Sequence, residues 1–184
     1  FLEIVITTCL DRGLTPVHLH DLPALLSNPS ERRRFVVFTL DDGYRDNAEF
    51  AAPIFRKFNV PYTIFITQGF FERSRTMWWA TAAALIEKVV EFEFDFGNGA
   101  ESVVCDTLSK KTFAFNRLAR FVHSSDEDVA VRMIDQAAIK NCIDPIAIVD
   151  NLVMNNTEIL RLSKDSLVHF GAHTVDHVNL SRVN

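Results

Sequence analysis

Two short motifs combine residue types that can bind a metal ion and move a proton. The first is Thr39-Leu40-Asp41-Asp42-Gly43, in which adjacent carboxylates repel each other unless a cation or a proton neutralises them. Gly43 permits a sharp turn that would direct both carboxylates toward one point. A solvated turn is the alternative interpretation, because Asp-Asp-Gly is common in turns.

The second motif, His173-Thr174-Val175-Asp176-His177, places two histidines four residues apart. On a helical turn they would share one face, and imidazole is the commonest ligand of zinc-like metals. Two surface histidines at a helix start are the alternative. Taken with the first motif, a carboxylate and two histidines make an open three-ligand site with room for water. The remaining carboxylate then has the position of a general base.

Apolar runs of strand length precede both motifs. Residues 35–40 (FVVFTL), 62–67 (YTIFIT) and 167–172 (LVHFGA) are typical of strands buried on both faces of a parallel sheet, so His169 is expected to be a core histidine. A helical pattern over residues 48–58 links the first two runs into a strand-helix-strand unit. Both motifs therefore follow the carboxyl ends of parallel strands, where α/β folds place their sites.

Residues from about 74 to 165 break this rhythm, and we interpret them as an insertion within a single domain over residues 1–184. Strict alternation and a Gly97-Asn98-Gly99 turn indicate a β-hairpin. The insertion is expected to contain strands at 91–96 and 102–105 and helices at 78–90, 110–122 and 127–139. Upstream of the first motif, residues 1–10 favour a helix.

The composition excludes several classes of protein. With 48% hydrophobic and 23% charged residues the chain is ordinary and globular, and a net charge of −5 argues against a nucleic-acid partner. Cys9, Cys105 and Cys142 form no Cys-x-x-Cys pair, so neither a cysteine-based zinc site nor a disulfide framework is expected. No apolar run reaches the roughly 20 residues of a membrane-spanning helix, and no signal peptide is visible. We therefore expect no membrane span and a cytoplasmic location.

The motifs resemble those of the polysaccharide deacetylases, carbohydrate esterase family four, also called the NodB-homology domain. The family pattern is Thr-Phe-Asp-Asp-Gly followed by His-Ser/Thr-x-x-His, and Leu40 replaces the usual Phe. The stretch from Phe35 to Gly69 resembles the family almost throughout. Trp78-Trp79 and Gly171-Ala172-His173-Thr174 are similar to a bacterial subgroup with a long insertion.

This resemblance implies a distorted (β/α) barrel and a metal-dependent hydrolase of amide bonds. Its substrate would be the N-acetyl group of an N-acetylglucosamine-type poly- or oligosaccharide. Asp41 would be the catalytic base, with Thr174 and Gly43 in supporting roles. The ligands of a divalent transition metal, with zinc first among the candidates, would be Asp42, His173 and His177.

The family's later segments, Arg-x-Pro to orient the base and Leu-x-His to supply the general acid, do not follow His177 in this sequence. The resemblance thus covers the front part of the family domain, so the barrel is expected to be incomplete and the chain alone inactive. Open sheet edges would favour self-association or further chain that covers them. Trp78 and Trp79 are candidates for a sugar-stacking platform, with core packing as the alternative.

Two other functions remain open from the residues. A phospho-receiver signalling domain also has a strand that ends in Asp-Asp and binds magnesium, but it leaves His173 and His177 unexplained. A catalytically inactive, carbohydrate-binding member of the family is the second alternative.

Overall fold

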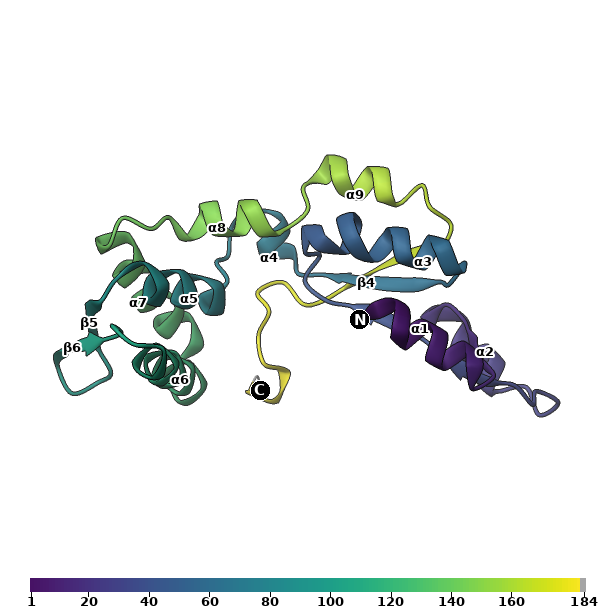
Figure 1. The fold of residues 1–184 in the computed structure, drawn as a ribbon, viewed down its shortest axis with the longest axis horizontal. Coiled ribbons are helices and arrows are strands. Elements are labelled where there is room, and N and C mark those ends of the chain that lie inside the picture. The colour runs from purple at the N-terminus through teal and green to yellow at the C-terminus, as the bar shows by residue number, and fades with distance from the viewer. Residues whose placement is uncertain (183–184) are drawn as a thin grey trace. The chain divides into compact units, whose positions relative to one another are not determined.

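The computed structural model describes residues 1–182 and divides into two compact units (Figure 1). Unit 1 comprises Phe1–Glu72 and Leu152–His177, and unit 2 comprises Arg73–Asn151 with residues 178–182. The chain thus leaves unit 1 and returns to it before the second motif. A single domain with an insertion over residues 74–165 stays a prediction, and the last part of that stretch lies in unit 1.

Unit 1 is built on a three-stranded parallel sheet with the strand order β3-β4-β7. Its strands are β3 (Phe38–Leu40), β4 (Tyr62–Ile66) and β7 (Val168–Ala172). Phe38 lies opposite Tyr62, which in turn lies opposite Val168, and both strand pairs are parallel. The predicted parallel pairing is confirmed. Among residues 1–182 the sheet ends at β3 and β7 and no closed barrel forms.

The continuous strand expected over residues 35–40 is wrong. The strand is interrupted at Val37. Its first part, β2 (Arg34–Val36), pairs with β1 (Leu14–Pro16) in a separate two-stranded parallel sheet. Only β3 joins the main sheet. The apolar pattern is unbroken across Val37 because it reports burial, whereas the partner of each half depends on distant parts of the chain.

The helices of unit 1 are mostly short. The helical pattern predicted over residues 48–58 forms as a π-helical segment followed by an α-helix, whereas the helices at residues 68–71 and 156–162 were not predicted. The segments are α1 (Leu2–Asp11), η1 (Leu19–Asp21), α2 (Leu22–Leu26), η2 (Asn47–Ala51), α3 (Ala52–Phe58), α4 (Gln68–Phe71) and α9 (Asn156–Leu162).

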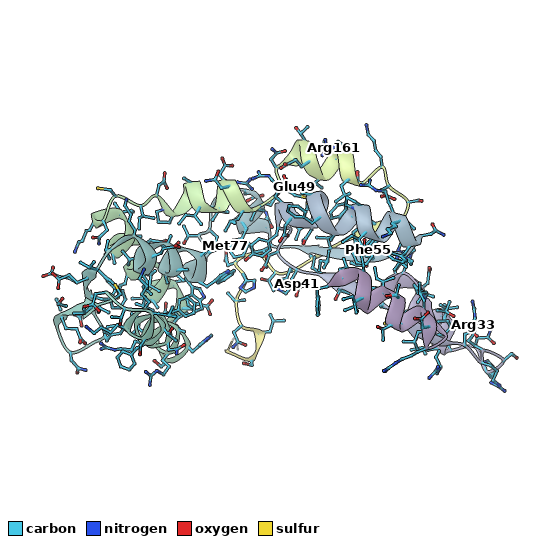
Figure 2. All side chains as sticks on the ribbon, in the orientation of Figure 1. Arg33, Asp41, Glu49, Phe55, Met77 and Arg161 are labelled. Carbon is cyan, nitrogen blue, oxygen red and sulfur yellow. The ribbon has the colours of Figure 1, made fainter. Side chains whose placement is uncertain are left out.

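The core of unit 1 lies on one face of its sheet. Phe55 of α3, labelled in Figure 2, stacks on Tyr62 of β4 with ring centroids 4.2 Å apart, and both are fully buried. Ile64 and Val168 belong to the same core. His169, whose side chain alternates to the opposite face, is exposed. The expectation of a core histidine is therefore wrong, and the ring of His169 instead packs against that of His20 at a centroid distance of 4.5 Å.

Unit 2 consists of a β-hairpin packed with helices. The expected hairpin forms, with Phe92 and Phe94 buried and Glu91 and Glu93 exposed, as strict alternation requires. The three helices expected there also form, with ends shifted by one or two residues. The elements are α5 (Trp78–Lys88), β5 (Glu91–Asp95), β6 (Ala100–Val104), α6 (Leu108–Ser124), α7 (Glu127–Lys140), α8 (Pro145–Leu152, whose last residue belongs to unit 1) and η3 (Leu180–Arg182). Within residues 1–182, no helix combines the length and apolarity that a bilayer crossing needs.

Candidate metal centre

The turn after β3 separates the two adjacent aspartates. Asp42 and Gly43 both have left-handed backbone, with φ of 65° and 67°. A Cβ on Gly43 would lie 2.6 Å from Ile66 Cδ1, so both the conformation and the space favour glycine. Asp42 is only 7% exposed, whereas Asp41 is exposed (Figure 2). One carboxylate therefore faces into unit 1 and the other remains accessible.

The second motif leaves β7 as an irregular segment. The helical turn expected to bring its histidines together does not form. Instead the segment continues alongside β4 and α4: His173 N donates to Ile66 O at 2.8 Å, and Gly69 N donates to Val175 O at 2.7 Å. Thr174 and His177 have left-handed backbone, with φ of 62° and 56°. The ring centroids of His173 and His177 lie 5.2 Å apart.

The three expected metal ligands meet at the carboxyl edge of the sheet. His177 Nε2 lies 3.5 Å and His173 Nε2 lies 4.0 Å from Asp42 Oδ1. One ligand atom from each residue lies within 4.8 Å of the other two. Two donors about 2.0–2.1 Å from one tetrahedral ion would be about 3.3 Å apart, so small side-chain shifts bring the set to zinc geometry. The residues present thus fit a divalent transition metal.

The charge of Asp42 also favours a cation here. Its side chain is 10% exposed and faces the two histidines. The hydroxyl of Thr67 lies 3.1 Å from Asp42 Oδ1 and equally far from His173 O, and its single hydrogen can serve one of them at a time. A neutral hydroxyl cannot balance a buried carboxylate, which needs a cationic partner. A metal ion would meet that need.

Thr67 is a neighbour of the centre that the sequence analysis missed, and Phe70 is a neighbour that the sequence offers only as a further candidate for the sugar-stacking platform. Thr67 is fully buried and follows β4, the strand between the two that carry the motifs, so its position in the run YTIFIT was the available signal. Phe70 of α4 stacks on His177 with ring centroids 5.5 Å apart. The hydroxyl of Thr174, expected to support the histidines, is buried without a hydrogen-bond partner. Its role stays a prediction.

Trp78 and Trp79 lie in unit 2. The ring of Trp78 packs against the core of that unit and stacks on Phe115 at a centroid distance of 6.2 Å. Trp79 meets Trp78 edge to face at 5.8 Å. These contacts agree with core packing for Trp78, and the sugar-stacking platform stays a prediction.

Comparison with known proteins bears on the first motif. Residues 28–114 match the family model described as polysaccharide deacetylase. The resemblance to the polysaccharide deacetylases is confirmed. The matched segment includes Asp41, Asp42 and Gly43. It ends before His173 and His177, whose assignment therefore depends on the geometry of the centre.

A solved structure described as the deacetylase domain of BpsB from Bordetella bronchiseptica is similar to the chain, with a TM-score of 0.46 and 10% sequence identity. The match covers 94% of this chain and 42% of that chain. None of the curated proteins matches this sequence.

Proposed function

We propose that this chain carries the metal centre and the catalytic base of a metal-dependent deacetylase. Its substrate would be an N-acetylglucosamine-type poly- or oligosaccharide, from which it hydrolyses the N-acetyl group. The observation that carries the proposal is the convergence of Asp42, His173 and His177 immediately beside Asp41. The family match over residues 28–114 supports the class of reaction.

The three candidate ligands would contribute differently to binding an ion. His173 and His177 would each bind the ion through one imidazole nitrogen. Asp42 adds a negative charge that a divalent ion offsets. When bound, a zinc-like ion would supply the Lewis acidity needed to polarise the acetyl carbonyl and acidify water. Zinc is favoured by this mixture of nitrogen and oxygen donors.

Asp41 has the properties of the general base. Its carboxylate is exposed and follows directly after β3, so substrate and water can reach it. Asp42 cannot take the same role, because its Oδ1 is turned toward the histidines and Thr67. Asp41 would accept the proton of the attacking water, a step that typically contributes 10²–10⁴-fold to the rate.

The test separates the two aspartates. Asp41→Asn keeps size and shape, so it should retain metal and lose about two to four orders of magnitude in turnover. Asp42→Ala should lower the metal affinity itself. Asp46→Asn, at another exposed carboxylate of unit 1, is the matched control and should change neither quantity.

Acetate release and metal content are measured on a protein that carries this chain together with the later family segments. Unchanged turnover in Asp41→Asn would overturn the assignment of the base. Equal metal loss in Asp41→Asn and Asp42→Ala would instead show that both carboxylates are ligands.

The cytoplasmic location and the assembly of this protein stay proposals. The sheet of unit 1 ends at β3 and β7, and such edges offer unpaired backbone groups to another strand. Self-association through these edges predicts a dimer or larger species in light scattering of this chain, and a stable monomer would contradict it.

A further inference from the structure

The turn that carries Asp42 is held by a segment far along the chain. Gly43 O accepts a hydrogen bond from Met154 N at 3.0 Å, and Tyr44 forms an isolated antiparallel bridge with Val153. Because Asp42 and Gly43 both have left-handed backbone, the turn depends on surrounding contacts to keep its conformation. The segment that begins at Val153 supplies those contacts.

A two-point ion pair completes the attachment. Arg45 Nε lies 2.9 Å from Glu158 Oε1, and Arg45 Nη2 lies 3.3 Å from Glu158 Oε2. Arg45 Nη2 also donates to Val153 O at 3.1 Å. Each of the two charged side chains is only 24% exposed, so water screens this pair less than a surface pair. The hydrogen bonds from Arg45 are the largest cause of the lowered pKa of Glu158, which favours its charged form.

Glu158 is itself fixed at the start of α9. Asn155 N donates to Glu158 Oε2 at 2.8 Å, and Glu158 N donates to Asn155 Oδ1 at 3.0 Å, which together form a capping box. A planar guanidinium facing a fixed carboxylate has little freedom to move. The start of α9, Arg45 and the Asp42 turn are therefore mechanically connected.

The histidines are attached elsewhere. His173 N donates to Ile66 O, and Gln68 N donates to Thr174 O at 3.3 Å, so this half of the centre is held by the end of β4 and the start of α4. The hydroxyl of Thr67 links Asp42 to this half, and Asp42 Oδ1 lies 3.5 Å from His177 Nε2. The distance from Asp42 to the two imidazoles thus depends on two separate attachments, one of which contains the Arg45–Glu158 pair.

We propose that Arg45 and Glu158 are positioning residues that hold Asp42 with its Oδ1 facing His173 and His177. The inference rests on the proposed metal-dependent function and extends it to a pair that touches neither ion nor substrate. Loss of the pair would leave all three ligands in the chain while weakening their convergence.

The test measures Zn²⁺ affinity and the Co²⁺ absorption spectrum after a chelator has stripped the purified full chain. Arg45→Met keeps the length of the side chain and removes its fork, and should weaken Zn²⁺ binding about 10- to 100-fold with an altered Co²⁺ spectrum. Arg45→Lys should restore only part of the affinity, because an ammonium cannot reproduce the two-point contact. Glu158→Gln keeps the shape needed for capping and should show a smaller loss than Arg45→Met.

Arg56→Met is the matched control. Arg56 lies in the same unit and pairs with Asp165 at 3.5 Å, away from the turn, so its loss should leave metal affinity unchanged. Equal affinities in Arg45→Met and Arg56→Met would overturn the proposal.

Amide hydrogen exchange at Met154 in metal-free protein gives a second, independent measurement. Faster exchange in Arg45→Met than in Arg56→Met is expected, because the Met154 amide bonds to the turn. Failure of the wild-type chain to bind any metal would sink the proposed function, while the exchange rates would still decide the positioning role. Equal exchange rates in the two variants would contradict the positioning role of Arg45 and Glu158.

Discussion

The two units of this protein obey the rules of sequence patterning to different degrees. In unit 2 the hairpin alternates, and α6 and α7 follow Thr107 and Asp126, whose side chains accept capping hydrogen bonds from Lys110 N and Val129 N. In unit 1 the helical segment after the Asp42 turn begins as the π-helical η2 at Asn47, and Asp46 before it makes no such bond, whereas α9 of the same unit has a capping box. Irregular helical turns of this kind are frequent at functional sites.

Buried polar groups sharpen the contrast. Within residues 1–182, unit 1 buries the polar or charged residues Asp42, Asn47, Thr63 and Thr67, whereas unit 2 buries only Thr81. Left-handed residues occur in both units, and Asn59 simply ends a helix, so strained backbone alone does not mark the centre. What distinguishes unit 1 is strain at a buried charge, a combination that proteins retain where they need it for chemistry.

The largest expected effect compares one histidine from each unit. His177→Ala should weaken Zn²⁺ binding by more than about 100-fold, above the typical cost of losing a group behind the ligands. His123→Ala, at the end of α6 in unit 2, should leave the affinity unchanged. Isothermal titration of chelator-stripped protein measures both. Equal losses of Zn²⁺ affinity in the two variants would show that the metal does not bind specifically in unit 1.

Glycines of the two units should differ in the free energy of unfolding. Gly43→Ala adds a left-handed alanine and a Cβ 2.6 Å from Ile66, and should cost about 2–3 kcal/mol. Gly97→Ala, in the hairpin turn, also has positive φ, but open space surrounds its Cβ, so about 1 kcal/mol is expected. Urea unfolding measures the difference. Identical losses of unfolding free energy in the two variants would contradict the tight enclosure of the turn at Gly43.

Two buried threonines provide a smaller comparison. Thr67→Val removes the hydroxyl beside Asp42 Oδ1 and should weaken Zn²⁺ binding about tenfold. The hydroxyl of Thr81 in α5 is buried without a hydrogen-bond partner, so Thr81→Val should leave binding unchanged and stability unchanged or higher. A Thr67→Val variant that binds as tightly as Thr81→Val would exclude Thr67 from supporting the centre.

The smallest effect concerns a half-buried carboxylate of unit 2. Burial raises the pKa of Asp135 above 3.8, although Thr76 and Arg75 partly oppose the rise. A raised carboxyl pKa favours the folded state when the group is protonated, so this contribution is lost as pH rises above 3.8 through the folded-state pKa. Asp135→Asn should therefore raise stability at neutral pH and flatten this part of the profile. Thermal melts from pH 3 to pH 8 measure it, and a destabilised variant would contradict it.

The sequence by itself determined the parallel strands, the hairpin and the three long helices of unit 2. It also identified Asp42, His173 and His177 as candidate ligands. These features depend on local periodicity and on residue type. The alternation around Phe92 and Phe94 has one physical solution once a hairpin forms, and a carboxylate with two histidines has few uses other than metal binding.

Only the tertiary structure decided the break at Val37, the burial of Asp42 beside an exposed Asp41, and the irregular return of His177. It also decided that Arg45 meets Glu158. Each of these depends on a partner from a distant segment, and a residue's own neighbours in sequence do not specify which partner it meets. Adjacent aspartates look equivalent in the sequence, and they differ because the left-handed turn at Asp42 and Gly43 sends one carboxylate inward and leaves the other in solvent.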